Sequence, residues 1–286
     1  IMGRDENMLA VSSPGKIIYG DHFTIRSLQD DSSSTNVQYT FEVDNTTYIS
    51  NPTANGNKAE FDALKYSGTT TIKIKVTRTA DGETPLSKTI TVQVLPKPIE
   101  IVIDDKEKYK GEANPTLTYQ DFKKQLVSWN GVQDVIQASD VKLSTTAKKD
   151  SNAGTYPIKG DSNSLNRTYP NYSFTFKEGT LKVIEENIED DWYHLELDDR
   201  NNTAYTGEWT NKDVNIISDH NEYTNLSLDQ STWKPSLVTI TREGENNQSF
   251  WMKKDSGAIT KEKQEIIKID KTAPKVKGIK AKDTNN

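Results

Sequence analysis

Histidine is the side chain that most often binds metals and transfers protons near neutral pH, and this sequence has three, His22, His194 and His220. None of them has a second histidine three or four positions away, or a cysteine nearby, as zinc sites usually require. The sequence also lacks Gly-x-Ser-x-Gly, Gly-x-Gly-x-x-Gly and a phosphate-binding Gly-Lys-Ser loop. We therefore expect ordinary surface or strand histidines, no catalytic residues and no cofactor.

Carboxylates gather in residues 185–191, which read Glu-Glu-Asn-Ile-Glu-Asp-Asp, and Asp198-Asp199 follows soon after. A calcium ion takes about six to eight oxygen ligands, which makes Asp190 and Asp191 weak calcium candidates. Their spacing does not match an EF-hand loop, so we favour a solvated acidic linker over a metal site. Glycoside cleavage requires two carboxyl groups, one of which has a pKa raised by an apolar pocket. A solvated linker provides no such pocket.

Tryptophan is concentrated near the end of the chain, at Trp192, Trp209, Trp233 and Trp251, with only Trp129 elsewhere. Exposed indole rings could form a platform on which sugar rings stack. Large aromatic side chains are more often partly buried in a core, so we favour a framework role for most of them. Trp192 and Trp233 are the less settled pair, and they are our candidate binding residues.

The composition limits the size of any core. Hydrophobic residues make up 33% of the chain and charged residues 27%, with a mean hydropathy of −0.79. Sandwich modules close a core in about 100 residues, so 286 residues suit three slim cores better than one broad one. The net charge of −6 and the pI near 5.3 oppose unaided binding to nucleic acid or anionic membranes, which requires basic patches.

The chain has no cysteine, which fits either a reducing compartment or the exterior of a Gram-positive cell, where disulfides are uncommon. It also has no run of about 18 apolar residues that would insert in a membrane. Residues 1–5 do not resemble a signal peptide, and residues 283–286 contain no sorting motif. We therefore expect the sequence to be a fragment of a longer protein.

Apolar residues alternate with polar ones along much of the chain, which predicts half-buried strands. The clearest sets are Tyr39/Phe41/Val43, Ile72/Ile74/Val76, Ile90/Val92/Val94, Ile99/Ile101/Ile103 and Tyr172/Phe174/Phe176. Only residues 121–127 show helical spacing, and we expect one or two turns there. Pro96-Lys97-Pro98 predicts a short, stiff linker.

An internal repeat accompanies this pattern. Tyr19-Gly20 is echoed by Tyr109 and Gly111 about 90 positions later. Alternating strands end with similar spacing, at Val94, Val183 and Ile269. The repeat predicts three modules.

Four motifs in the middle of the chain resemble, in order, the MBG-type bacterial immunoglobulin-like domain over roughly residues 98–186. They are Tyr109-Lys110-Gly111-Glu112 and its continuation to Tyr119, then residues 154–158, 171–176 and 179–183. The resemblance implies a small β-sandwich in a modular bacterial surface protein, and it implies no chemistry. It also favours the Gram-positive exterior as the reason for the missing cysteines.

The flanking segments show related resemblances. Residues 19–21 and 67–69 resemble the Tyr-Gly-Asp opening and the small-Gly-Thr strand entry of bacterial immunoglobulin-like repeats. Residues 269–274, Ile-Asp-Lys-Thr-Ala-Pro, resemble the closing motif of immunoglobulin-like domains in Gram-positive surface proteins. This second resemblance places Trp209 and Trp251 on framework strands.

We therefore predict an all-β chain of three tandem immunoglobulin-like β-sandwich domains in an elongated arrangement. The expected domains are residues 1–97, 98–186 and 187–274, with 275–286 as a tail or the start of another module. The expected function is a non-catalytic stalk in a Gram-positive cell-surface or secreted adhesin-like protein, extracellular and anchored to the cell wall in the full-length protein. We expect a monomer that binds no nucleic acid and does not insert in a membrane.

An alternative function is a carbohydrate- or host-protein-binding module, in which the third domain recognises the ligand through sandwich loops or through Trp192 and Trp233.

Overall fold

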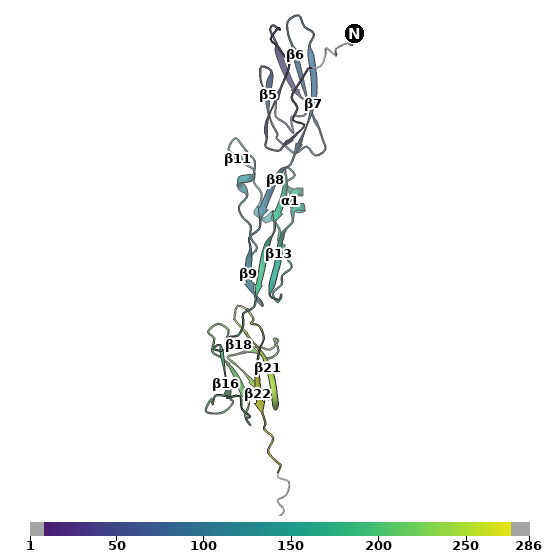
Figure 1. Ribbon diagram of the computed structural model, residues 1–286. Coiled ribbons are helices and arrows are strands. Elements are labelled where there is room, and N and C mark those ends of the chain that lie inside the picture. Colours follow the sequence, from purple (N-terminus) through teal and green to yellow (C-terminus); the bar gives the residue numbers. More distant parts are fainter. Residues whose placement is uncertain (1–8, 276–286) are drawn as a thin grey trace, which may run out of the picture. The chain divides into compact units, whose positions relative to one another are not determined.

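The computed structural model describes residues 9–275, and most of their regular structure is β-strand (Figure 1). These residues form two compact units. The first unit comprises residues 9–104, 117–144 and 158–179, and the second comprises 105–116, 145–157 and 180–275. The domain boundaries at 97/98 and 186/187 stay predictions. The predicted tail, apart from Lys275, lies outside the described residues, as do residues 1–8.

The first unit contains a β-sandwich built from residues 16–95. One sheet has the order β1 (Lys16–Ile18), β7 (Leu86–Leu95), β6 (Ile72–Thr79) and β3 (Gln38–Val43). The other has the order β2 (His22–Arg26), β5 (Lys58–Asp62) and β4 (Thr53–Asn55). All neighbours are antiparallel except β1 and β7, which run parallel. Burial alternates along β6 because successive side chains point to opposite faces of a sheet.

The same unit continues directly from this sandwich. Only Pro96 separates β7 from β8 (Lys97–Val102), which pairs in parallel with β14 (Tyr172–Lys177). The predicted linker is therefore mostly strand. The unit also contains a short hairpin of β10 (Ser128–Trp129) and β11 (Val132–Gln133), with the 3-10 turns η1 (Lys123–Gln125) and η2 (Ala138–Asp140) on either side.

One helix was not expected. The turn η1 confirms the helical spacing at residues 121–127, but α1 (Ser162–Thr168) is the longer helix and packs against β14. Its first turn is capped by Asp161, whose carboxylate accepts from the N–H of Ser164 at 3.0 Å, and Leu165 is buried. Serine and asparagine are weak helix formers, so the expectation that residues 121–127 are the only helical segment was wrong.

The second unit contains another β-sandwich. One sheet has the order β16 (Tyr193–Leu197), β17 (Val214–Ser218) and β20 (Leu237–Ile240). The other has the order β19 (Lys234–Pro235), β18 (Asn225–Ser227), β21 (Gly244–Lys253) and β22 (Lys263–Ile269). A further sheet, most of whose residues belong to the second unit, has the order β12 (Leu143–Thr145), β13 (Gly154–Gly160), β15 (Gly179–Ile184) and β9 (Lys106–Tyr109), in which β9 and β15 run parallel.

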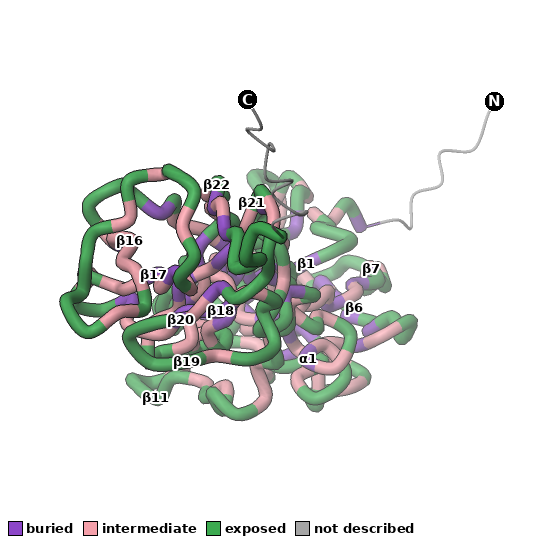
Figure 2. The backbone as a smooth tube through the Cα atoms, turned by 90° about the horizontal axis from the view of Figure 1, so that it is seen from below, coloured by how far each residue is buried: buried purple, intermediate pink, exposed green. Residues whose placement is uncertain are grey.

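The buried hydrophobic residues concentrate on the strands, while the connecting loops are mostly exposed (Figure 2). One cluster in the first unit joins Ile17 and Val94 with Ile99, Val127 and Phe174. A second cluster lies in residues 188–269. The expectation of a separate core in each of three modules is therefore wrong at the first boundary, where one core continues past Pro96.

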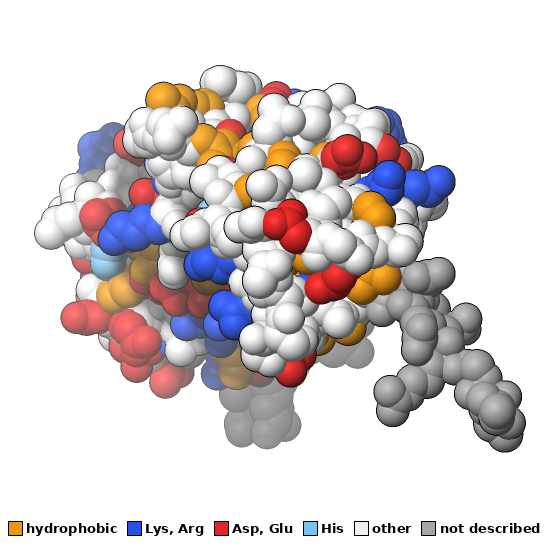
Figure 3. All heavy atoms as spheres, turned by 90° about the horizontal axis from the view of Figure 1, so that it is seen from above, with side chains coloured by type: hydrophobic (Ala, Val, Ile, Leu, Met, Phe, Trp, Pro, Cys, Tyr) orange, Lys and Arg blue, Asp and Glu red, His pale blue; other side chains and the backbone are white. Residues whose placement is uncertain are grey.

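The all-β fold of immunoglobulin-like sandwiches predicted from the sequence is confirmed. Among residues 9–275, the helices lack the length and hydrophobicity that a membrane span requires. Acidic and basic side chains are interspersed on the face of the molecule shown in Figure 3.

Candidate functional site

A tight turn at residues 18–21 follows β1 and carries the Tyr19-Gly20 pair. The N–H of Ile18 donates to Oδ2 of Asp21, and the N–H of Asp21 donates back to the carbonyl of Ile18, both at 2.9 Å. Gly20 has a φ of +91°, which suits glycine at the third position of a type II turn. The N–H groups of Tyr19 and Gly20 donate to the carbonyls of Leu95 and Ala63, so the turn is fixed at the ends of both sheets.

Gly20 lies against Val127, a buried residue from the predicted second module. A Cβ at position 20 would lie 2.5 Å from Cγ2 of Val127, far closer than van der Waals contact allows. Any side chain at this position would push the two segments apart. The glycine is therefore required both by its backbone conformation and by the space around it.

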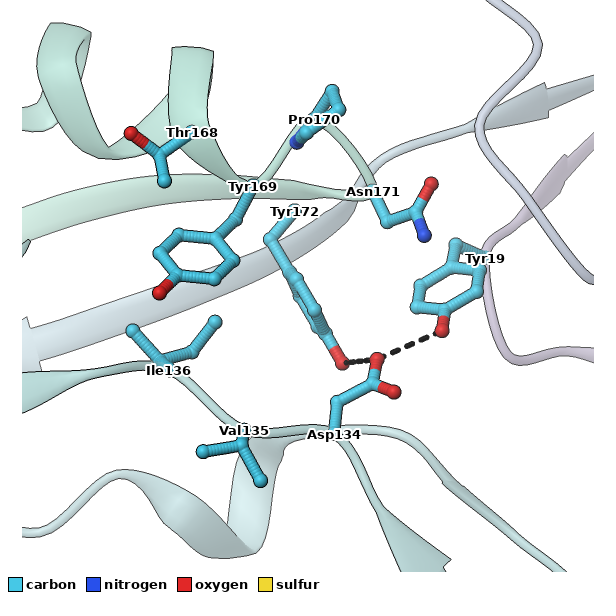
Figure 4. A pocket seen from close by; sticks show the side chains of 9 residues that line it. All are labelled: Tyr19, Asp134, Val135, Ile136, Thr168, Tyr169, Pro170, Asn171 and Tyr172. Atoms are coloured by element: carbon cyan, nitrogen blue, oxygen red, sulfur yellow. Dashed lines mark hydrogen bonds between the residues drawn. The ribbon is translucent and has the colours of Figure 1, made fainter.

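Two tyrosines share one carboxylate beside this contact (Figure 4). The hydroxyls of Tyr19 and Tyr172 donate to the same oxygen, Oδ2 of Asp134, at 2.7 and 2.5 Å. The Tyr172 hydroxyl also accepts from the N–H of Val127 at 2.9 Å, and the two rings pack edge to face. We call Tyr19, Gly20, Val127, Asp134 and Tyr172 the first joint, because they connect the first predicted module to the second.

The tyrosines of the first joint stay protonated over a wide pH range. Burial, followed by the hydrogen bond to Asp134, raises the pKa of Tyr19 to about 12. The same two causes, in the same order, raise the pKa of Tyr172. Both hydroxyls therefore act as hydrogen-bond donors at neutral pH.

A cavity of about 290 Å³ opens beside the first joint. It is lined by Tyr19, Asp134, Val135, Ile136, Thr168, Tyr169, Pro170, Asn171 and Tyr172 (Figure 4). The lining includes no histidine, lysine or cysteine, and its carboxylate already accepts two hydrogen bonds. This arrangement supports a structural connection better than proton transfer near neutral pH.

A second pair of hydrogen bonds supports the same connection. The side-chain oxygen of Asn171 accepts from the N–H of Tyr66 at 3.0 Å, and its backbone carbonyl accepts from the N–H of Lys97 at 2.9 Å. Asn171 thus ties the start of β8 and a loop of the first sandwich to the start of β14.

The candidate tryptophans have different surroundings. Trp192 is half-buried, stacks on Tyr223 with ring centres 5.1 Å apart, and lines a cavity of about 450 Å³ together with four glutamates. Trp233 does not line that cavity, and its ring lies 4.5 Å from Nζ of Lys253. Their role in binding stays a prediction.

The calcium candidates lie at the start of the second sandwich. Asp190 is exposed and pairs with Nζ of Lys263 at 2.6 Å, and this hydrogen bond lowers the pKa of its carboxyl. Among residues 9–275, no group of three His, Asp or Glu side chains is arranged to hold a metal ion. Nothing beyond the sequence supports Asp190 or Asp191 as ligands.

The histidines each have partners of their own. His22 pairs with Asp62 and His194 with Asp219, and these hydrogen bonds raise the pKa of both imidazoles. Nδ1 of His220 accepts from the N–H groups of Glu222 and Tyr223, which shapes a turn.

Trp209 does not have the framework position that the sequence predicted. It lies outside the strands and is 55% exposed, whereas Trp251 lies in β21 and is half-buried. The backbone around Trp209 makes only one bridge, from Thr210 to Ile269, so no strand forms there to bury the indole.

Asp134 was missed by sequence reasoning. It stands in the stretch Val-Gln-Asp-Val, and nothing in that pattern identifies it as the acceptor for two distant tyrosines. Alternation correctly buries the Tyr172 ring, but it gives no partner for its hydroxyl. The Ile-Tyr-Gly-Asp sequence at residues 18–21 was the one available signal, because glycine followed by aspartate favours a tight turn.

We expect the first unit to lose stability at alkaline pH. The unfolded chain releases tyrosine protons near pH 10, while folded Tyr19 holds its proton up to about pH 12, so the free energy of unfolding should fall across this interval. Urea unfolding at several pH values should show a shallower fall for Tyr19→Phe than for the wild type. Phe41→Leu, which removes no tyrosine, should keep the wild-type slope, and equal slopes in all three proteins would contradict the assignment.

Gly20→Ala should destabilise the first unit more than Gly82→Ala. Both glycines have positive φ, so both variants carry the about 1–2 kcal/mol strain of a left-handed alanine. Only position 20 adds overlap with a neighbour, because nothing lies within 4 Å of a Cβ at Gly82. Crowding of this kind costs about 1–3 kcal/mol more. Urea denaturation measures the difference in the free energy of unfolding. Equal losses in the two variants would contradict the prediction, because they would show that the Val127 side chain moves aside at no cost.

Residues 99–182 match the family model described as MBG domain (YGX type). This match lies within the region whose motifs resemble that family, so the resemblance is confirmed for these residues. No curated protein matches the sequence.

Several solved structures of low sequence identity are similar to the chain. One is SGBP-B from the mixed-linkage glucan utilization locus of Bacteroides ovatus, with a mixed-linkage heptasaccharide. It is 13% identical to this chain. The similarity covers 94% of this chain and 68% of that chain, with a TM-score of 0.22. The fibronectin(III)-like modules of Clostridium thermocellum CbhA are 9% identical to this chain. The similarity covers 95% of this chain and 100% of that chain, with a TM-score of 0.24. Human protocadherin-24 EC1-2 is 11% identical to this chain. The similarity covers 63% of this chain and 100% of that chain, with a TM-score of 0.27. At these TM-scores the similarities support no conclusion about function.

Proposed function

We propose that this chain is a non-catalytic spacer in a bacterial cell-surface or secreted adhesin-like protein, and that it holds other domains away from the envelope. The full-length protein is then an extracellular protein of a Gram-positive bacterium and is attached to the cell wall. This segment of it is a monomer. The match of residues 99–182 to a bacterial domain family supports the bacterial origin. The closing motif at residues 269–274 and the absence of cysteine support the Gram-positive exterior.

The first joint is the observation that carries this proposal. A chain of small domains transmits position only if its joints are stiff, because flexible linkers let the domains reorient. Here one residue separates β7 from β8, Gly20 contacts Val127 directly, and Asp134 accepts from tyrosines of both segments. These contacts fix the two segments against each other without forming a reactive centre.

Small-angle scattering tests the spacer function. A compact globule of 286 residues has a radius of gyration of about 19 Å. We expect a clearly larger value for this protein, with the same value for Gly82→Ala as a matched control. A radius near that of the globule would contradict the proposal.

A second function, binding of a glycan or a host protein by residues 187–274, is favoured by the exposure of Trp209 and by the half-buried Trp233 under Lys253. Exposed aromatic rings can stack on sugars, and sandwich loops can carry recognition.

A glycan array probed with the whole chain tests this second function. A specific glycan that is retained by the wild type and lost by Trp233→Ala or Trp209→Ala would support binding. Trp129→Ala, in the first unit, is the control. An array without a specific signal would leave the spacer as the better assignment.

A further inference from the structure

The second unit contains a turn of the same construction at residues 109–112. The N–H of Tyr109 donates to Oε2 of Glu112 at 3.0 Å, and the N–H of Glu112 donates back to the carbonyl of Tyr109 at 3.2 Å. Gly111 has a φ of +89°. The N–H of Lys110 donates to the carbonyl of Ile184, the last residue of β15, at 2.9 Å.

The two turns correspond position by position. Each follows a strand that pairs in parallel with the strand preceding the next predicted module, β1 with β7 and β9 with β15. In each, the third residue is glycine with φ near +90°, and the fourth is a carboxylate that accepts from the N–H of the first. Gly20 therefore corresponds to Gly111. The two tyrosines do not correspond, because Tyr19 is second in its turn and Tyr109 is first.

Each glycine contacts the module that comes next in the sequence. Gly20 contacts Val127, and Gly111 contacts Gly257. A Cβ on Gly111 would overlap the carbonyl oxygen of Gly257, and a Cβ on Gly257 would lie 2.6 Å from the carbonyl oxygen of Gly111. The two backbones therefore touch directly, and neither position tolerates a side chain without moving the other.

Polar contacts surround this pair of glycines. The N–H of Ile259 donates to the carbonyl of Lys110 at 2.8 Å, and the hydroxyl of Ser256 donates to Oε1 of Glu112 at 2.8 Å. The carboxylate of Glu112 thus closes its own turn with one oxygen and holds the neighbouring loop with the other.

A buried ammonium group supports the turn from within. Nζ of Lys108, a residue only 5% exposed, donates to the carbonyls of Glu112, Lys148 and Lys149 at 2.9, 2.6 and 3.1 Å. The N–H of Gly111 also donates to the carbonyl of Lys149. These hydrogen bonds therefore hold Gly111 in one position.

We propose that this carboxylate-closed glycine turn is a docking surface whose partner is the next β-sandwich module of the chain. The partner presents either a buried β-branched side chain, as Val127 does, or a second left-handed glycine, as Gly257 does. The inference rests on the proposed spacer function, since it assigns the element that makes the joints stiff. It also predicts that Gly111, Glu112 and Gly257 act as one contact.

Hydrogen exchange at the Ile259 amide tests the proposal in the whole chain, because this N–H bonds across the contact to Lys110. In Gly111→Ala and in Gly257→Ala we expect exchange at least about tenfold faster than in the wild type. The controls are Gly207→Ala and Gly244→Ala. Gly207 has a φ of +85° and Gly244 of +105°, close to those of Gly111 and Gly257, and both have open space around a Cβ. They carry the same backbone strain and should leave Ile259 unchanged.

Exchange at amides paired between β21 and β22 shows whether the second sandwich remains folded. Fast exchange at Ile259 with β21 and β22 still protected supports the docking surface. Unchanged exchange in both variants, or equal acceleration in the controls, overturns it. The spacer function is judged separately by the scattering of the wild-type protein, so either idea can fail alone.

Discussion

The close approach of a neighbouring segment to a left-handed glycine is the constraint on which the described structure depends. The neighbour is the Val127 side chain at Gly20 and the Gly257 backbone at Gly111. Gly20 and Gly111 each adopt a φ that other residues rarely adopt, and each leaves no room for a side chain. The surrounding hydrogen bonds serve to hold these glycines in place. Leu95 and Ala63 do so for the first turn, and Ile184 and Lys149 do so for the second. In the proposed spacer, the stiffness of the connections arises from turns that belong to the sandwiches themselves.

Buried polar groups supplement a modest hydrophobic content. Arg78 is 2% exposed, and its guanidinium donates to Asp31, Glu83 and Ser34, which connects the loop at 31–34 with the turn at 80–83. Lys108 is satisfied by three carbonyls, and Asp134 accepts from two tyrosines. Each of these groups would be costly to bury without partners, so each one selects a single arrangement of the loops around it.

The strands could be predicted because alternation reports directly on which face is buried. Ile72, Ile74 and Val76 are all fully buried in β6, and Ile99 and Ile101 are buried in β8. Helix α1 could not be predicted in this way, since its stability comes from one cap and one buried leucine rather than from propensity. The continuation of the first core past Pro96 also has no local signal, because Val127 and Tyr172 are distant from Ile17 in sequence.

The two glycine turns, at residues 18–21 and 109–112, could be only partly predicted from the sequence. The echo of Tyr19-Gly20 by Tyr109 and Gly111 was a real repeat, but it was aligned on the tyrosines, whereas the structure aligns it on glycine and the acidic residue after it. Backbone conformation decides this register, and a search for similar aromatic residues does not detect it. Asp134 and Gly257 had no signal of their own because their roles appear only when distant segments meet.

The parallel pairing of β1 with β7 also has a mechanical consequence. Lys16 lies opposite Gln93 and Ile18 opposite Leu95, so the chain enters β1 at one end of the ladder and leaves β7 at the other. Tension applied to the two ends of this sandwich slides the strands past each other in shear. The evenly spaced bonds of a parallel ladder then bear the load together instead of opening one after another. The pairing of β9 with β15 has the same geometry.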